Sequence, residues 1–295
     1  MPELPAISIV TPSFNQGRFL EECILSVLGQ DYPNVEHIVI DGGSADESVD
    51  VIRRHEDRLA HWVSEPDEGQ YHAINKGFAK TSGEVMAWLN SDDRYLPWAL
   101  SCVGEVFRAF PEVEWVTTAY PVALDERGRA VECRSVPAYQ RDAFFRGRNL
   151  AGDGWYNTGY IQQESTFWRR SLWERAGGYV DISLSLAADY ELWARFFRHA
   201  DLYTVHALLG GFRQHGEQRT AGGRLDDYRD QAMSVLRRHG GRPYGRAASW
   251  LRPRAAAWLP SDRRGIARRL GLTYSGPTIR QDAAGEWAIE DLRFV

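Results

Sequence analysis

Two adjacent aspartates, Asp92 and Asp93, follow an apolar run at residues 85–89 and are well suited to chemistry. Two carboxylates about 4 Å apart at an effective dielectric near 20 repel each other by about 4 kcal/mol. A hard divalent cation offsets this repulsion, and Mg²⁺ typically binds one or two carboxylates together with substrate phosphates. The pair therefore predicts a cation site at the end of a strand. A simple turn, or an N-cap role for Asp93, is the alternative without a cation.

Two other residues have side chains that could take part in a reaction. Asp189 opens an amphipathic segment, residues 188–193, where it could accept a proton or only cap a helix. His215 closes the phrase Arg213-Gln214-His215 and could hold a metal or be an ordinary loop histidine. Taken singly, neither residue decides between a functional and a structural role.

The elements that must position these residues follow from the apolar pattern. Short apolar runs alternate with helical spacing, which predicts an α/β fold with a mostly parallel sheet flanked by helices. Loops at the carboxyl ends of parallel strands meet over one crevice, so polar clusters there predict a binding site. Three clusters follow predicted strands in this way: Thr11-Pro12-Ser13, Asp41-Gly42-Gly43-Ser44 and Ser91-Asp92-Asp93.

The composition describes a globular protein rather than a nucleic-acid-binding or membrane-spanning one. The chain has 295 residues, of which 43% are hydrophobic, and a formal net charge of −5, which disfavours a nucleic-acid partner. The N-terminus lacks a signal-peptide pattern, and no apolar run approaches the roughly 20 residues needed to span a bilayer. Three scattered cysteines favour a reducing compartment. We therefore expect a cytoplasmic protein.

Two segments have no clear periodicity or a distinct composition. Residues 134–160 form an irregular aromatic stretch with Trp155 and Tyr156, which could form an acceptor surface or equally belong to the core. Residues 237–270 are rich in arginine and carry Trp250 and Trp258. This second segment could dock on an anionic membrane. A solvated helical extension or a homodimer contact is an equally good interpretation.

Several phrases, taken in order, resemble the family 2 glycosyltransferases with the Rossmann-like GT-A fold. The ordered set is highly specific, although one phrase alone is weak. The resemblance implies a GT-A domain at residues 1–220, with a nucleotide-binding half at about 1–96 and an acceptor and catalytic half at about 97–220, and a helical, arginine-rich extension at 221–295. The matching phrases are Ser8-Ile9-Val10-Thr11-Pro12-Ser13-Phe14-Asn15, Asp41-Gly42-Gly43-Ser44, Ala73-Ile74-Asn75-Lys76-Gly77, Trp88-Leu89-Asn90-Ser91-Asp92-Asp93, Thr166-Phe167-Trp168-Arg169-Arg170, Gly177-Gly178-Tyr179, Ala188-Asp189-Tyr190-Glu191-Leu192-Trp193 and Arg213-Gln214-His215.

The resemblance implies a donor-binding role for five residues in the first half of the chain. Thr11, Pro12 and Asp41 match the part of the family's pocket that holds the nucleotide base. Asn75 matches a donor-pocket position in the helix before the motif strand. Asp92 matches the ribose side of the family's DXD-type motif.

The resemblance also implies a metal and a base. Asp93 matches the ligand of a Mn²⁺ or Mg²⁺ ion on the diphosphate, and His215 matches a histidine that helps to bind the metal or diphosphate in some members. Asp189 matches the catalytic base, with Glu191 as the second choice. One departure is Asn90, where many members have an aspartate, which implies one fewer charge near the cation.

These roles fit an inverting transfer. An acceptor hydroxyl attacks the anomeric carbon in one displacement, so one base is required, and a metal can stabilise the departing nucleotide diphosphate. A glycosidase would need two carboxylates that flank the bond. We therefore expect transfer from a nucleotide-diphosphate sugar, with a UDP-sugar favoured, to a hydroxyl of a glycan or lipid-linked acceptor in bacterial cell-surface polysaccharide or glycoconjugate synthesis. A peripheral contact with the inner face of the membrane is compatible with this function.

Two other functions share this type of fold. A sugar-phosphate nucleotidyltransferase usually has a glycine-rich, basic loop after the first strand, whereas this chain has no basic residue there before Arg18. A non-catalytic glycan- or nucleotide-binding protein would not need the three aspartates Asp92, Asp93 and Asp189. Both remain alternatives to the transferase.

Overall fold

The structure is a computed structural model that describes residues 3–150, 159–218, 223–245, 251 and 272–294. Nine strands of this part of the chain form one sheet, in the order β13-β12-β10-β6-β9-β4-β1-β2-β3, and four form a second sheet, β5-β11-β7-β8. The strands are β1 (Ile7–Ser13), β2 (Val35–Asp41), β3 (His61–Ser64), β4 (Val85–Trp88), β5 (Arg94–Tyr95), β6 (Trp115–Thr118), β7 (Val122–Leu124), β8 (Ala130–Cys133), β9 (Phe167–Arg169), β10 (Tyr203–Val205), β11 (Gly210–Arg213), β12 (Tyr274–Gln281) and β13 (Trp287–Phe294).

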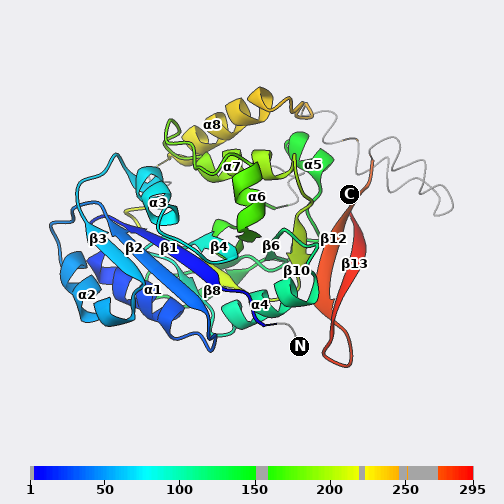
Figure 1. The fold of residues 1–295 in the computed structure, drawn as a ribbon. Coiled ribbons are helices and arrows are strands. Elements are labelled where there is room, and N and C mark those ends of the chain that lie inside the picture. Colours follow the sequence, from blue (N-terminus) through cyan, green and yellow to red (C-terminus); the bar gives the residue numbers. More distant parts are fainter. Residues whose placement is uncertain (1–2, 151–158, 219–222, 246–250, 252–271, 295) are drawn as a thin grey trace.

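Helices cover both faces of the nine-stranded sheet. Figure 1 shows α1, α2 and α4 on one side of the sheet and α3, α6 and α7 on the other, with α8 outside α7. The helices are α1 (Gly17–Leu28), α2 (Ser48–Arg54), α3 (Gln70–Phe78), α4 (Ala99–Ala109), α5 (Arg141–Phe145), α6 (Arg170–Arg175), α7 (Ala188–Phe196) and α8 (Leu225–Arg238). This arrangement confirms the predicted α/β class with a mostly parallel sheet.

The parallel part of the sheet brings the predicted polar clusters to one edge. β1 pairs in parallel with β2 on one side and with β4 on the other, so that Ser13 is opposite Asp41 and Val10 is opposite Trp88. β9 is antiparallel to both β4 and β6. The residues that follow β1, β2 and β4 therefore lie next to one another, as expected for a ligand crevice in an open sheet.

An aromatic core fixes α7 against the sheet. The indole of Trp193 on α7 stacks on Trp88 of β4 with ring centroids 6.0 Å apart, and on Trp115 of β6 at 5.6 Å. The edge of Trp168 on β9 meets Trp88 at 5.6 Å. Offset or edge-on aromatic pairs of this kind contribute about 0.5–1.5 kcal/mol each beyond their buried area. The first turn of α7, which carries Asp189, is thereby held at a defined place above the sheet.

The C-terminal part of the chain belongs to the same body. Ala232, Val235 and Leu236 of α8 are buried in the same core cluster as Trp88, and β12 extends the main sheet through parallel pairing with β10. The predicted division at residue 220 therefore does not separate two hydrophobic cores. The expectation of a wholly helical extension is wrong for the last strands, because β12 and β13 form an antiparallel hairpin.

Some expectations concern residues outside the described part of the chain. Trp155 of the irregular stretch lies there, as do Trp250, Trp258 and most of the arginine-rich segment. Among the described residues, none of the helices has the length and apolar character required to cross a bilayer.

Candidate active site

The turn after β4 gives Asp92 and Asp93 very different surroundings. Asp93 is 1% exposed, and its carboxylate accepts hydrogen bonds from the Arg213 backbone N–H at 2.8 Å and from Asn90 Nδ2 at 3.0 Å. The side chain of Asp92 is 20% exposed. The two carboxylates therefore do not share one role, because Asp93 is enclosed in the protein and Asp92 faces the crevice.

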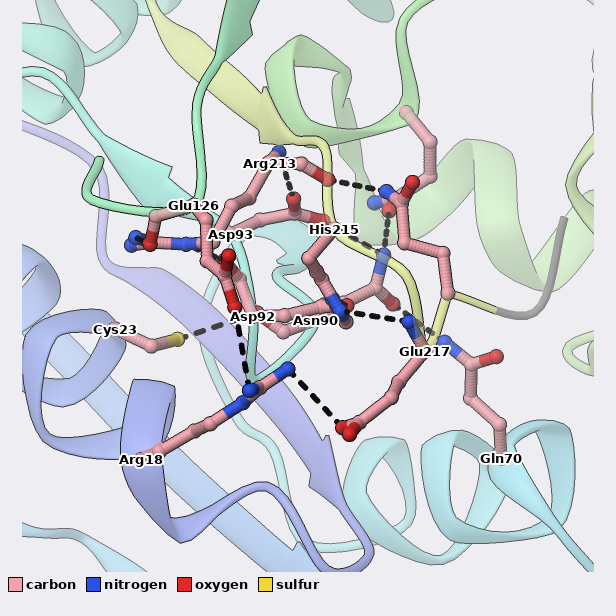
Figure 2. A network of polar contacts seen from close by, with 12 residues as sticks. Arg18, Cys23, Gln70, Asn90, Asp92, Asp93, Glu126, Arg213, His215 and Glu217 are labelled. Atoms are coloured by element: carbon pink, nitrogen blue, oxygen red, sulfur yellow. Dashed lines mark hydrogen bonds and ion pairs between the residues drawn. The ribbon is translucent and has the colours of Figure 1, made fainter. Parts of the chain in front are cut away.

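Asp92 forms a pair with His215, which comes from the loop after β11. His215 Nε2 lies 2.9 Å from Asp92 Oδ2 (Figure 2). The imidazole packs on Phe19 with ring centroids 4.7 Å apart. The backbone N–H of Glu217 donates to His215 Nδ1 at 3.3 Å, which assigns the ring proton to Nε2 in this arrangement. The structure thus brings together two residues that are 123 positions apart in the sequence.

Arg213 organises the loop that carries both aspartates. Its side chain is 1% exposed, and its guanidinium donates to the Asp92 backbone carbonyl at 2.5 Å and to the Glu126 carbonyl at 2.9 Å (Figure 2). It also donates to Glu22 Oε2 at 2.6 Å. A buried guanidinium needs such partners, because an unpaired buried charge is costly. Sequence reasoning missed this role, and its only signal was that Arg213 lies two residues before His215.

Asn90 is the centre of a small amide network. Its Oδ1 accepts from Gln70 Nε2 at 2.6 Å, and its Nδ2 donates to Asp93 at 3.0 Å and to Gln163 Oε1 at 3.3 Å. An aspartate at this position could not donate to Asp93 and would add a third carboxylate to the turn. The departure from the family pattern is therefore matched by hydrogen bonds within this chain.

Glu164 is a buried carboxyl that sequence reasoning also missed. It lies in a short 3₁₀ helix, Gln163–Ser165, is 5% exposed and hydrogen-bonds with Asp93. Burial, together with the charges of Asp189 and Asp92, raises the pKa of Glu164 to about 7. Burial and the charges of Glu164 and Asp92 also raise the pKa of Asp93. The two carboxyl groups therefore favour a shared proton at neutral pH.

Glu164 predicts a pH dependence of stability in the metal-free protein. Folding raises its pKa from the ordinary value of 4.5 to about 7, so the stabilising contribution of its proton is fully present below pH 4.5 and lost as the pH rises through about 7. The expected loss is about 3 kcal/mol for the wild type. Urea unfolding at pH 5 and pH 8 in EDTA measures it. Glu164→Gln, which cannot ionise, should lose clearly less stability, and an equal loss in both proteins would contradict the assignment.

Asp189 lies in the first turn of α7, and its surroundings link it to the rest of the site. The Tyr228 hydroxyl on α8 donates to its carboxylate, at 3.3 Å from Oδ1 and 3.2 Å from Oδ2. The charges of Asp189 and Asp92 both raise the pKa of the buried Glu164, so the three carboxyl groups are linked electrostatically. The site therefore consists of a carboxylate–imidazole pair at the sheet edge and a separate carboxylate on α7.

Glu191, the second choice for a base, is occupied by structural contacts. It is 3% exposed and forms ion pairs with Arg195 at 2.9 Å and with His239 at 3.2 Å. Burial alone would raise the pKa of Glu191, but the hydrogen bonds from His239 and Arg195 hold it below its ordinary value. Arg195 also donates to the Ala176 and Tyr179 carbonyls. We therefore assign Glu191 to the packing of α7 rather than to catalysis.

The residues expected to hold the nucleotide base are more deeply built into the fold than the sequence suggested. Thr11 and Pro12 were expected in a loop but form the end of β1, and Thr11 Oγ1 lies 3.0 Å from His37 Nε2. Asp41, also buried, accepts from the Ser44 N–H at 2.9 Å, the Ser44 hydroxyl at 2.5 Å and the Ser64 hydroxyl at 2.7 Å. Asp41 therefore shapes the loop after β2.

Asn75, the remaining predicted donor-pocket residue, ties two elements together. Its Nδ2 donates to the Val180 carbonyl and its Oδ1 accepts from the Val180 N–H, both at 2.8 Å. In the same helix, a Cβ at Gly77 would overlap the Val10 side chain, so glycine lets α3 pack directly on β1. These contacts explain the Asn-Lys-Gly phrase by packing, and we do not assign Asn75 to donor binding.

The side chains of Asp92 and His215 at the sheet edge suit a metal ion that takes its other ligands from the bound substrate or from water. Two cis ligands each about 2.1 Å from an octahedral ion lie about 3 Å apart, and Asp92 Oδ2 and His215 Nε2 are 2.9 Å apart. Within the described ranges, no group of three or more His, Cys, Asp or Glu side chains is arranged to hold an ion. The residues therefore fit a cation that keeps water or phosphate oxygens in its other positions.

Solved structures identify the fold as that of GT-A glycosyltransferases. Staphylococcus aureus TarS, residues 1–349 in complex with UDP-GlcNAc, superposes with a TM-score of 0.61 at 14% identity and covers 90% of this chain and 75% of that one. The chain spans 45% of the longer TarS structure. The mannosyltransferase PcManGT from Pyrobaculum calidifontis, in complex with GDP-Man and Mn²⁺, gives a TM-score of 0.51 at 16% identity over 92% of this chain and 85% of its own.

Sequence comparison then defines the family. The model of glycosyl transferase family 2 matches residues 8–175. An uncharacterized glycosyltransferase of Mycobacterium tuberculosis (strain H37Rv) is 30% identical over 217 residues, which is 73% of this chain and 78% of that protein. One of Rickettsia prowazekii is 26% identical over 236 residues, 79% of this chain and 72% of that protein. The chain belongs to glycosyl transferase family 2 and is a glycosyltransferase.

Proposed function

We propose that this protein transfers a sugar, with inversion, from a nucleotide-diphosphate donor to a hydroxyl of a glycan or lipid-linked acceptor. The observation that carries the proposal is the pairing of Asp92 with His215 at the carboxyl edge of the parallel strands, with Asp189 on a separate helix. The Asp92–His215 pair suits the diphosphate end of a donor, and the Asp189 carboxylate suits an acceptor hydroxyl. A UDP-sugar is favoured, in keeping with the UDP-GlcNAc complex of TarS.

Asp92, rather than Asp93, is our choice for the metal ligand. Asp93 accepts hydrogen bonds from Arg213 and Asn90 and is closed off from the crevice, whereas the side chain of Asp92, beside the buried His215, is 20% exposed. This reverses the order that the resemblance implied for the two aspartates. Mn²⁺ or Mg²⁺ at this pair would neutralise the charge of the leaving diphosphate. PcManGT, a structure of similar fold, was solved with Mn²⁺.

The nucleotide base belongs at the ends of β1 and β2. The loop after β2 is held by the Asp41 carboxylate, which accepts hydrogen bonds from Ser44 and Ser64. Thr11 and Pro12 form the adjoining wall of β1. The side chains of Thr11 and Asp41 are engaged within the protein, so we expect this part of the pocket to recognise the base mainly through backbone groups and shape.

Asp189 acts as the general base. In an inverting displacement the acceptor oxygen forms a bond to the anomeric carbon while the bond to the diphosphate oxygen breaks, and the hydroxyl proton passes to Asp189. Arg213 and Asn90 keep the aspartate turn in place through their hydrogen bonds, so that Asp92 keeps its position at the leaving group. One general base without a general acid matches this residue set, because the leaving group is a weakly basic diphosphate.

The remaining context is proposed on the same basis. The acceptor belongs on the α7 side of the site, where Phe144 of α5 packs on Tyr190, and the transfer belongs to cell-surface polysaccharide or glycoconjugate synthesis. A cytoplasmic location, with a peripheral membrane contact or a homodimer contact through the arginine-rich segment, is compatible with that role.

A donor screen tests this function directly. Thermal unfolding is followed with UDP-GlcNAc, UDP-glucose and GDP-mannose, each with Mn²⁺ and with EDTA, because a ligand that binds only the native state raises the melting temperature. The expected result is a shift for one nucleotide sugar that is larger with Mn²⁺, together with release of its nucleoside diphosphate. Release of pyrophosphate from a nucleoside triphosphate and sugar phosphate would instead indicate a nucleotidyltransferase. Binding without any turnover would indicate a non-catalytic protein.

A further inference from the structure

Helix α8 brings a tyrosine hydroxyl to the carboxylate proposed as the base. Tyr228 lies on α8 and its hydroxyl donates to Asp189, at 3.3 Å from Oδ1 and 3.2 Å from Oδ2. The matched family segment ends at residue 175, well before this helix. The hydroxyl has one proton and lies nearly equidistant from the two oxygens, so it can donate to either of them. The helix that carries Tyr228 therefore lies beyond the segment that the family model matches.

Polar contacts that dock α8 on α7 hold Tyr228 in place beside Asp189. Gln231, one turn after Tyr228, accepts from the Ser185 and Leu186 N–H groups at 3.2 and 3.0 Å. At the end of the helix, His239 pairs with Glu191 at 3.2 Å. These bonds fix the helix along its length against α7 and the residues before it. Tyr228 cannot leave Asp189 without breaking them or changing its own rotamer.

Tyr228 is suited to donate and not to accept at neutral pH. Burial and the charge of Asp189 raise the pKa of Tyr228 well above its ordinary value, so the hydroxyl keeps its proton. Among the described residues, Tyr71 interacts electrostatically with Tyr228, and Glu164 interacts with Asp189. Tyr190, next to Asp189 on α7, interacts with both. Only Glu164 among these three can add negative charge near neutral pH, so a donor at Asp189 opposes that charge.

We propose that Tyr228 is a positioning residue that holds the Asp189 carboxylate ionised and oriented toward the acceptor hydroxyl. The proposal rests on the proposed function, in which Asp189 is the base. A carboxylate has about four acceptor sites, so the tyrosine and the acceptor hydroxyl can be bound at the same time. The tyrosine does not touch the reacting atoms. It acts through Asp189, because a hydrogen bond to the charged form lowers the pKa of a carboxyl group.

The test is the pH profile of Tyr228→Phe, assayed as UDP release from UDP-GlcNAc with Mn²⁺. We expect kcat to fall about tenfold on the acidic side and to recover as the pH rises, because the acidic limb moves up by about one pH unit. The KM for UDP-GlcNAc should stay within about twofold, since among the described residues no hydrogen bond or ion pair joins α8 to Asp92 or His215, which pair with each other. An unshifted acidic limb would overturn the proposal.

A matched control separates positioning from packing. Tyr190, next to Asp189, is buried, and its hydroxyl has no hydrogen-bond partner among the described residues. Tyr190→Phe removes the same chemical group from the turn of α7 that carries Asp189 and should leave the acidic limb in place. If both variants lower kcat equally at all pH values, Tyr228 has only a packing role and the proposal fails.

A second measurement needs no turnover, and together with the kinetics it distinguishes a wrong role for Tyr228 from a wrong role for Asp189. In a double-mutant cycle by urea unfolding, Tyr228→Phe and Asp189→Ala should be coupled by about tenfold in the unfolding constant. Additive effects would show that the bond is absent and overturn the proposal. If Asp189→Ala retains full turnover, the proposed base itself is wrong. If Asp189→Ala is inactive and Tyr228→Phe behaves as wild type, only the role of Tyr228 is wrong.

Discussion

Asp189→Asn is expected to lower kcat by about 10³-fold while the protein remains folded, because general base catalysis typically contributes 10²- to 10⁴-fold. The amide keeps the size of the side chain and can still accept the hydrogen bond from Tyr228, but it cannot take a proton. The KM of the donor should change little, since Asp92 and His215 are untouched. Initial rates of nucleoside diphosphate release, with circular dichroism as the check on folding, measure the effect.

Glu191→Gln is the contrasting variant. Glu191 is held in ion pairs with Arg195 and His239, so its loss should reduce stability much more than turnover corrected for folded protein. Removing one partner of a buried ion pair typically costs about 3–5 kcal/mol. Near-normal rates for Asp189→Asn together with an inactive but folded Glu191→Gln would exchange the roles of the two acids.

Asp92→Asn is expected to lower kcat/KM by about 100-fold and to raise the Mn²⁺ concentration needed for half-maximal rate. The variant keeps the shape of the side chain and an acceptor for His215 Nε2, but removes the negative charge that a divalent cation requires. His215→Asn should shift the Mn²⁺ dependence in the same direction. Rates measured across a Mn²⁺ titration distinguish a lost ligand from a general loss of activity.

Asp93→Asn serves as the control for the neighbouring carboxylate. Asp93 is buried against Arg213, Asn90 and Glu164, so the substitution should change stability and leave the Mn²⁺ midpoint of the remaining activity unchanged. If the Mn²⁺ midpoint moves with Asp93→Asn and not with Asp92→Asn, the order implied by the family resemblance is correct and our assignment is reversed.

Local sequence patterns were sufficient to predict the frame of the site. The apolar runs that became β1, β2 and β4 are short and end in polar residues, and a parallel sheet necessarily brings such ends together. The aspartate pair could be placed at the end of its strand for this reason. The α/β class followed from the same alternation of strand and helix patterns and is confirmed.

The separate roles of the individual site residues could not be predicted from the sequence. Which of two adjacent aspartates is enclosed depends on Arg213, which lies 120 positions beyond Asp93, and on the buried Glu164. Asn75 looked like a ligand-binding amide, and only the position of Val180 shows that both of its polar atoms are used in the fold. Periodicity says nothing about contacts over such separations in the chain.

The C-terminal hairpin illustrates the same limit. Strands β12 and β13 follow a long arginine-rich segment whose composition predicts no sheet. Strand β12 pairs with β10, about 70 residues earlier in the chain, and β13 pairs with β12. Whether a strand adds to an existing sheet depends on the free edge of that sheet, which is formed by residues far away in the sequence. Helical composition nearby was therefore a poor guide to these residues.

The pairing of β12 with β10 also has a consequence for the folding of the nascent chain during its synthesis on the ribosome. β10 at Tyr203–Val205 becomes an inner strand only when residues 274–281 reach it, and these are synthesised long after the residues of the active site. During that interval the nascent chain presents β10 with unpaired backbone groups, the type of edge at which chains aggregate. A truncation designed to remove the arginine-rich segment by ending near residue 238 would make that temporary state permanent.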